Sequence, residues 1–169
     1  MVRPATAADA AAIAAVAVRS WREGYRGIVP ERIDPVRAWD PAGIAARLEA
    51  PGEHPSSTLV AEVGGRITGF VVLGACRDSD VASAAGEVWA LYVDPDHWRR
   101  GVGRQLVEAA LDGLAAAGHA EATVWTLGES ERNLRFYEAL GFRRDGATQR
   151  RESFGSPLEV RLRTGLLQG

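Results

Sequence analysis

The stretch VDPDHWRRGVGRQLVEAAL, residues 93–111, joins the end of an apolar run to the start of a helical pattern. At this junction two glycines, Gly101 and Gly103, stand among Arg99, Arg100 and Arg104. Glycine lets the backbone approach a ligand closely, and the free N–H groups at a helix start favour an anion. The arginines add positive charge at the same place. The stretch therefore predicts either an anion-binding loop or a strand-to-helix turn with solvated arginines.

Two standard nucleotide-binding loops do not fit this stretch. A Walker loop needs Gly-Lys-Ser/Thr, but the chain has no lysine, so all 20 of its basic residues are arginine. A dinucleotide fingerprint needs a third glycine at the position that Leu106 occupies. The missing lysine also excludes Schiff-base chemistry. A nucleotide-dependent enzyme that uses this loop is therefore the least favoured interpretation.

The composition limits the class of protein. A chain of 169 residues, 46% hydrophobic and 25% charged, predicts one globular domain over residues 1–169 without a membrane span. A net charge of -2 argues against nucleic acid as the primary partner. Cys76 is the only cysteine, which excludes an internal disulfide and favours a reducing, cytoplasmic location. The three histidines have no metal-ligand spacing with one another or with Cys76, so no metal site is expected.

Hydrophobic periodicity and turn residues predict the order β-α-α-β-β-β-α-β-α-β-β. Asp40 and Pro41 begin a short helix, and Gly64-Gly65 form a hairpin turn between two apolar runs. The remaining elements are strands over 1–5, 57–63, 66–76, 87–93 and 121–127, around Phe142 and over 158–164, and helices after Asp9 and over 102–117 and 130–140. This order indicates a mixed α/β sheet without repeats.

The segment from Glu87 to Phe142 resembles the GNAT acetyltransferase superfamily. Two quoted stretches carry the resemblance: EVWALYVDPDHWRRGVGRQLV and VWTLGESERNLRFYEALGF. SWREGYRGIVPERID, from Ser20, also looks like the acceptor-side opening of many members. The resemblance implies a mostly antiparallel mixed sheet flanked by helices, with splayed parallel central strands that bind acetyl-CoA as co-substrate. It further implies acetyl transfer to an amine acceptor, by a monomer or homodimer.

The resemblance assigns the acetyl-CoA site to two segments. The backbone N–H groups of the loop Arg99, Arg100, Gly101, Val102, Gly103 and Arg104 would hold the pyrophosphate. Leu91, Tyr92 and Val93 would pair with the pantetheine arm as the edge of a strand does. The loop departs from the family at Trp98, where members usually carry Arg or Gln. Because backbone groups do most of the work in such a loop, we expect altered affinity rather than lost binding.

A second departure lies before the helix of residues 130–140. Ser130 stands where an asparagine of the family often contacts CoA, and Asn133 stands where members commonly have a small residue. Both are candidate cofactor contacts. Ser130 is also a good helix N-cap, and this structural role remains an alternative.

Tyr137 and Glu87 are the candidate catalytic residues. Tyr137 matches the tyrosine of the family motif in RFYEALGF, and a positioned phenol can protonate the thiolate that leaves when the thioester breaks. Glu87 stands at the start of a strand, where many members carry a glutamate that acts through water as general base on the amine. A backbone N–H between Leu91 and Val93 is the candidate oxyanion donor. The alternatives are a half-buried helix aromatic for Tyr137 and a solvated residue for Glu87.

The acceptor itself is not identified by the sequence. Candidate pocket aromatics are Trp21, Tyr25, Trp39 and Trp89, and candidate groups that attract a cationic amine are Glu23, Asp34 and Asp40. The favoured function is an N-acetyltransferase that acts on a small amine, an amino acid derivative or a protein N-terminus in a ternary complex. The departures at Trp98 and Ser130 keep a second interpretation open, a non-catalytic acyl-CoA sensor on the same fold.

Overall fold

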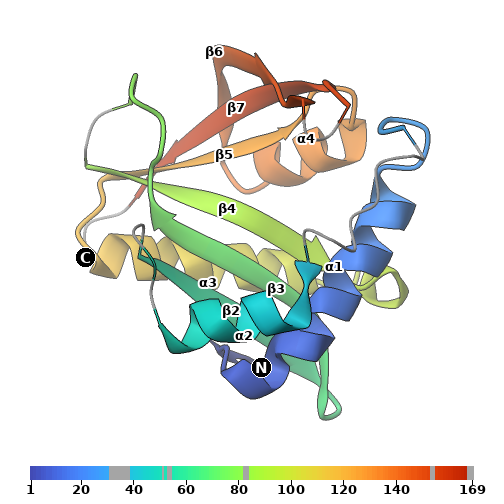
Figure 1. Ribbon diagram of the computed structural model, residues 1–169. Helices are drawn as coiled ribbons and strands as arrows, with labels where there is room; N and C mark the ends of the chain where they lie inside the picture. The colour runs from blue at the N-terminus through green and yellow to red at the C-terminus, as the bar shows by residue number, and fades with distance from the viewer. Residues whose placement is uncertain (31–38, 51, 53–54, 82–83, 153–154, 167–169) are drawn as a thin grey trace.

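Seven strands form a sheet in the order β1-β2-β3-β4-β5-β7-β6 in the computed structural model, which describes residues 1–30, 39–50, 52, 55–81, 84–152 and 155–166 (Figure 1). The strands are β1 Val2–Pro4, β2 Ser56–Val63, β3 Arg66–Ala75, β4 Ala85–Val93, β5 Glu121–Leu127, β6 Arg143–Arg150 and β7 Leu158–Gly165. The helices are α1 Ala10–Gly24, α2 Pro41–Glu49, α3 Val102–Ala116 and α4 Glu131–Glu138. Of the adjacent pairs, only β4 and β5 run parallel, which confirms the predicted mixed, mostly antiparallel fold.

Local sequence signals explain where the elements begin and turn. The Asp40 side chain accepts a hydrogen bond of 2.8 Å from the backbone N–H of Gly43, so it caps α2 as predicted. Gly64 and Gly65 have φ values of 58° and 74°, which fits a tight hairpin between β2 and β3. The strand predicted near Phe142 begins one residue later, at Arg143, because the Phe142 backbone N–H donates to the carbonyl of Tyr137 in α4, at 3.1 Å, rather than to a neighbouring strand.

The two faces of the sheet carry separate apolar clusters. Val71, Leu73 and Val88 pack with α3 and with the buried Tyr137 and Phe142, which places α3 and α4 over the same face. On the other face, Val60 and Phe70 pack against α1 and α2. Figure 1 shows α1 and α2 together on the face opposite α3. The sheet therefore separates a surface covered by α1 and α2 from one covered by α3 and α4.

The centre of the sheet opens between β4 and β5. Residues Ala85–Val88 of β4 pair with Glu121–Val124 of β5. β4 continues beyond this pairing to Val93. A bulge accompanies the divergence, because β3 residues 72 and 73 pair with Ala90 and Val88 and leave Trp89 without a partner. Beyond this point the edge of β4 that faces β5 has no strand beside it among the described residues. The predicted splayed strands are thus present, and they leave backbone groups of Leu91–Val93 available to a ligand.

Candidate functional site

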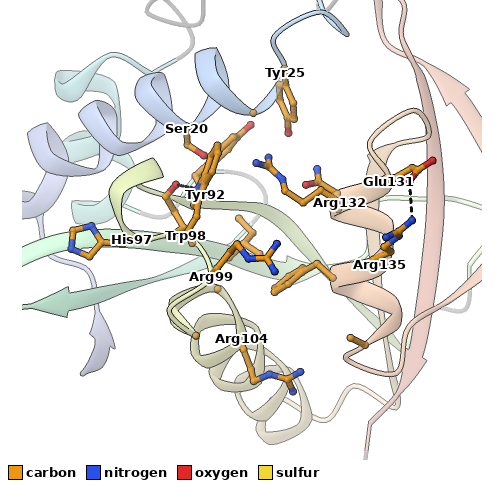
Figure 2. A pocket seen from close by; sticks show the side chains of 18 residues that line it. Ser20, Tyr25, Tyr92, His97, Trp98, Arg99, Arg104, Glu131, Arg132 and Arg135 are labelled. Atoms are coloured by element: carbon orange, nitrogen blue, oxygen red, sulfur yellow. Dashed lines mark hydrogen bonds and ion pairs between the residues drawn. The ribbon is translucent and has the colours of Figure 1, made fainter.

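A cavity of about 800 Å³ lies where β4 and β5 diverge (Figure 2). Its walls come from the end of α1, the end of β4, the β4–α3 loop, the first turn of α3 and one side of α4. These segments span residues 20–139, so the fold brings together parts of the chain that are distant in sequence. The cavity is large enough for a small-molecule ligand.

The β4–α3 loop forms one wall and has the features of an anion site. Gly101 caps α3 with a φ of 82°, and Arg99 also has a positive φ, of 60°. α3 is 15 residues long and carries no acidic residue in its first turn. Arg99, Gly101, Gly103 and Arg104 line the cavity, so the free N–H groups and positive end of α3 face the same space.

Two members of the predicted loop do not line the cavity. Val102 is 7% exposed and belongs to the hydrophobic core on the α3 face, whereas Arg100 is exposed. Their side chains therefore anchor the loop or face solvent. In the predicted pyrophosphate site, Arg100 and Val102 could therefore contribute only their backbone groups.

Gly103 allows α3 and α4 to approach each other beside the cavity. A Cβ atom at this position would lie 3.3 Å from Cζ of Phe136, which also lines the cavity. This distance is tighter than ordinary van der Waals contact. A larger residue at 103 would therefore push against α4 and narrow the cavity.

The predicted strand residues Leu91, Tyr92 and Val93 all line the cavity. Tyr92 packs its ring edge-on against Trp39, with centroids 5.3 Å apart. Burial, with the neighbouring Tyr25, raises the pKa of Tyr92 well above its ordinary value. Tyr92 therefore stays protonated as part of the cavity wall.

Tyr137 is buried behind the cavity wall, with 6% of its surface exposed. Its ring packs edge-on against Phe136 and Phe142, with centroids 5.1 and 5.5 Å away. Burial raises the pKa of Tyr137 above its ordinary value, and Tyr25 contributes in the same direction. Its neighbour Phe136, rather than Tyr137 itself, is among the residues that line the cavity. The phenol is thus held neutral by its apolar surroundings, with Tyr25 near enough to influence its ionisation.

Glu87 is buried, so the alternative interpretation of a solvated strand residue is wrong, while its role as general base stays a prediction. It is 2% exposed, and Arg77 binds it through three hydrogen bonds. The Arg77 backbone N–H and Nε donate to Oε2 at 3.0 and 3.1 Å, and Nη2 donates to Oε1 at 2.6 Å. Arg77 also stacks on Trp89, 4.5 Å from the ring centroid. The structure places Glu87 where β4 and β5 still pair, outside the set of residues that line the cavity.

The residues that open α4 have divided roles. Ser130 is 6% exposed, and its Oγ accepts a hydrogen bond of 3.4 Å from the Asn133 backbone N–H. Ser130 is thus the N-cap of α4, the structural role given above as the alternative to cofactor contact. Asn133 lines the cavity, and its Nδ2 donates to Oγ1 of Thr126 at 3.3 Å. Asn133 therefore reaches the cavity, whereas Ser130 holds the helix start.

Trp98 and Arg132 form a contact across the cavity that the sequence did not reveal. The Trp98 indole N–H donates to the carbonyl of Val93 at 2.6 Å, and the Arg132 guanidinium lies 4.1 Å from the Trp98 ring centroid. Figure 2 shows Arg132 reaching from α4 into the space between Trp98 and Tyr25. Nothing local to Arg132 in the sequence marks it, because its partners belong to other elements.

The candidate acceptor residues are scattered. Tyr25 lines the cavity and packs edge-on against the buried Trp21. The Arg77 guanidinium stacks on the ring of Trp89. Asp40 caps α2, and Glu23 forms an ion pair of 2.7 Å with Arg26. Asp34 lies outside the described residues.

Metal-ligand clusters and membrane-spanning helices are both absent from the described part of the chain. No group of three or more histidine, cysteine, aspartate or glutamate side chains there is arranged to hold a metal ion. None of the described helices is both long and apolar enough to cross a membrane.

Comparison with known proteins gives a consistent family and fold. The sequence profile of the Acetyltransferase (GNAT) family matches residues 12–142. A mycothiol acetyltransferase of Acidimicrobium ferrooxidans is 36% identical over 106 residues, which are 62% of this chain and 33% of that protein. The chain thus spans about a third of the length of this curated relative.

Solved structures resemble the fold over almost the whole chain. The PaiA N-acetyltransferase of Thermoplasma acidophilum in complex with coenzyme A has a TM-score of 0.74 at 19% identity, with 95% of this chain and 96% of that chain covered. The ribosomal-protein-S18-alanine N-acetyltransferase of Escherichia coli has a TM-score of 0.70 at 18% identity, with 100% and 95% covered.

Proposed function

The chain belongs to the GNAT acetyltransferase family, and on this premise we propose that it moves the acetyl group of acetyl-CoA to a primary amine by direct attack in a ternary complex. The observation that carries the proposal is the cavity between the diverging strands. One wall offers the N-terminus of α3 with Gly101, Gly103 and two arginines, and another offers an unpaired strand edge. A ligand with a diphosphate and an amide-containing arm, such as CoA, fits this pair of walls.

Each wall has a proposed task in binding. The backbone N–H groups of residues 99–104 would bind the diphosphate, and the open edge of Leu91–Val93 would pair with the amides of the pantetheine arm. Glycine at 103 keeps the approach clear, because a side chain there would meet Phe136. Asn133 and Arg132 extend the binding surface onto α4. The acetyl thioester supplies the electrophilic carbonyl, which this arrangement would hold in the gap between the strands.

Protons must move in two places for the transfer to occur. The acceptor loses a proton to become a nucleophile, and the thiolate that leaves gains one. We assign the second task to Tyr137, which burial keeps protonated. A backbone N–H from Leu91–Val93 would stabilise the oxyanion. We assign the first task to Glu87, acting through water, with Arg77 fixing the position of its carboxylate.

Glu87→Gln tests the proposed base. An alkyl amine with a pKa of about 10.4 is almost wholly protonated at pH 7, so loss of the base is expected to lower turnover there. The deficit should shrink as the pH rises, since solvent then supplies more neutral amine. Acetyl-CoA affinity should stay unchanged, because Glu87 lies outside the cavity wall. The measurement is a pH–rate profile of both proteins with one acceptor.

The pH profile also separates catalysis from structure at Glu87. If Glu87 serves only as the ion-pair partner of Arg77, the variant should lose thermal stability while its pH–rate profile keeps the shape of the wild-type profile. Superimposable profiles would remove Glu87 from the mechanism. An acceptor with an α-amine, whose pKa is near 7.7–8.0, should show a smaller deficit than an alkyl amine if the assignment is right.

The whole function is tested by amine-dependent release of CoA thiol from acetyl-CoA. The acceptor panel should include a mycothiol-type amine and a peptide with an N-terminal alanine, because proteins with these names are relatives in sequence or fold. We expect thiol release that depends on at least one amine, with an acetylated product of matching mass. Tight acetyl-CoA binding without transfer to any amine would favour the acyl-CoA sensor instead.

A further inference from the structure

The cavity has two chemically different ends. Arginines and the start of α3 surround one end, whereas Tyr25 and Tyr92 line the other, next to α1. Tyr137, the remaining tyrosine of the chain, is close enough to raise the pKa of Tyr92, and Tyr25 in turn raises the pKa of Tyr137. An anionic cofactor is drawn to the arginine end, so its reactive tail would point toward the tyrosine end. The acceptor would therefore meet the cofactor among these phenols.

Glu159 lies on the same side of the sheet as this tyrosine end. On β7 it is the register partner of Leu127 on β5, and paired residues of antiparallel strands project from the same face. Leu127 packs with Trp21 and Val29 in a cluster that Tyr25 and Tyr92 also contact. The fold thus places a carboxylate from a distant part of the sequence next to the cluster that both tyrosines contact, just behind the residues that line the cavity.

The Glu159 carboxylate is buried but only partly engaged. It is 6% exposed, and its Oε2 accepts hydrogen bonds from Nε2 of Gln149 at 2.7 Å and from Nε of Arg151 at 3.3 Å. Arg161, two residues further along β7, is committed to Asp78, Asp80 and Asp145. Oε1 of Glu159 therefore accepts no hydrogen bond from the described residues and can accept one from a ligand.

Electrostatic coupling supports the placement of this carboxylate. The pKa of Tyr25 is raised chiefly by burial and also by the negative charge of Glu159. The positive charge of Arg132 lowers the pKa of the same phenol. Tyr25 thus lies within electrostatic reach of a carboxylate from β7 and a guanidinium from α4. A cationic ligand beside Tyr25 would be attracted by the first group and repelled by the second.

We propose that Glu159 is an acceptor-binding residue, whose carboxylate holds a cationic ammonium group of the acceptor at the tyrosine end of the cavity. The inference rests on the proposed function, because it takes the arginine end as the acetyl-CoA site. It makes the acceptor class a cationic amine rather than a neutral or anionic one. The phenols of Tyr25 and Tyr92 form the wall against which that amine packs.

A tethered probe tests this inference without knowledge of the natural acceptor. S-(3-aminopropyl)-CoA carries an ammonium group beyond the sulfur, and S-butyl-CoA replaces that group by a methyl of similar size. Calorimetry should show that the wild-type protein binds the ammonium probe about tenfold more tightly or better, because hydrogen bonds to charged groups are worth that much. S-(aminoalkyl)-CoA probes with two and four methylenes vary the distance between the sulfur and the ammonium group, so that one of them can match the distance from the sulfur site to Glu159.

Two variants and one control decide whether Glu159 causes the preference for the ammonium probe over S-butyl-CoA. Glu159→Gln should abolish the preference for the ammonium probe but still bind S-butyl-CoA like the wild-type protein, which shows that the site remains folded. Glu159→Asp draws the carboxylate back by one methylene, so the preferred probe should become one methylene longer. Glu49→Gln, on the exposed end of α2, should keep the wild-type preference.

The possible failures are distinguishable. Equal binding of the ammonium and methyl probes by the wild-type protein would overturn the inference, as would a preference that survives Glu159→Gln. Failure of both probes to bind the wild-type protein would instead overturn the proposed function and the inference with it. A purely structural role for Glu159 would weaken both probes together and would not change the preferred chain length in the aspartate variant.

Discussion

Replacing Tyr137 with phenylalanine is expected to lower turnover by about 10²- to 10⁴-fold, the range that a general acid typically contributes. The substitution removes only a hydroxyl, and the packing against Phe136 and Phe142 uses the ring. Acetyl-CoA affinity should therefore change little. The measurement is steady-state turnover with one acceptor, together with calorimetry of acetyl-CoA binding.

The pH dependence gives an independent check on Tyr137. Burial raises its pKa above the ordinary value of about 10, so the phenol stays protonated across neutral and mildly alkaline pH. Wild-type activity should therefore show no loss from Tyr137 ionisation as the pH rises to about 9. Unchanged turnover in Tyr137→Phe, with chemistry limiting the rate, would exclude the residue as the acid.

Placing aspartates at Gly101 and Gly103 together is expected to weaken acetyl-CoA binding by about 100-fold or more. The two carboxylates would stand where the diphosphate is proposed to bind, and close like charges cost several kcal/mol. At position 103 the new side chain would also press on Phe136. Calorimetry of acetyl-CoA with the double variant measures the effect.

A matched double variant controls for the loss of glycine. Gly64→Asp with Gly65→Asp introduces the same residues in the β2–β3 turn, where φ is positive and a Cβ meets nothing within 4 Å. Aspartate tolerates the left-handed conformation better than most residues. The control should therefore keep wild-type acetyl-CoA affinity and differ from it only slightly in thermal stability. Equal affinity in both double variants would show that the cofactor binds elsewhere.

Contiguous signals in the sequence predicted most of the fold. Helix caps, the Gly64-Gly65 turn and hydrophobic periodicity depend on residues near one another, and the corresponding elements are present. The placement of β7 between β5 and β6 was not predicted, because strand order depends on contacts between distant segments. The gap between β4 and β5 was expected only from the family resemblance. A bulge at Trp89 has no reliable local signature in a single sequence.

The residues of the candidate site likewise fall into those that local sequence predicted and those that only tertiary contacts reveal. The loop of residues 99–104 was recognisable because its glycines and arginines are adjacent in the chain. The contact between Trp98 and Arg132 and the position of Glu159 beside Leu127 depend on tertiary pairing, so no local pattern revealed them. The surroundings of Glu87 were not predicted either. Its sequence position left a solvated residue open as the alternative to the general base, but Arg77, just beyond the end of β3, covers the carboxylate.

A crystal structure of the protein with bound acetyl-CoA would show directly whether the gap between β4 and β5 is the cofactor site. We expect the diphosphate against the backbone N–H groups of residues 99–104. We also expect the pantetheine arm along Leu91–Val93 in the gap between β4 and β5, with the acetyl group toward Tyr25 and Tyr92. Acetyl-CoA bound at another surface, or with its arm outside the gap between the strands, would contradict this expectation.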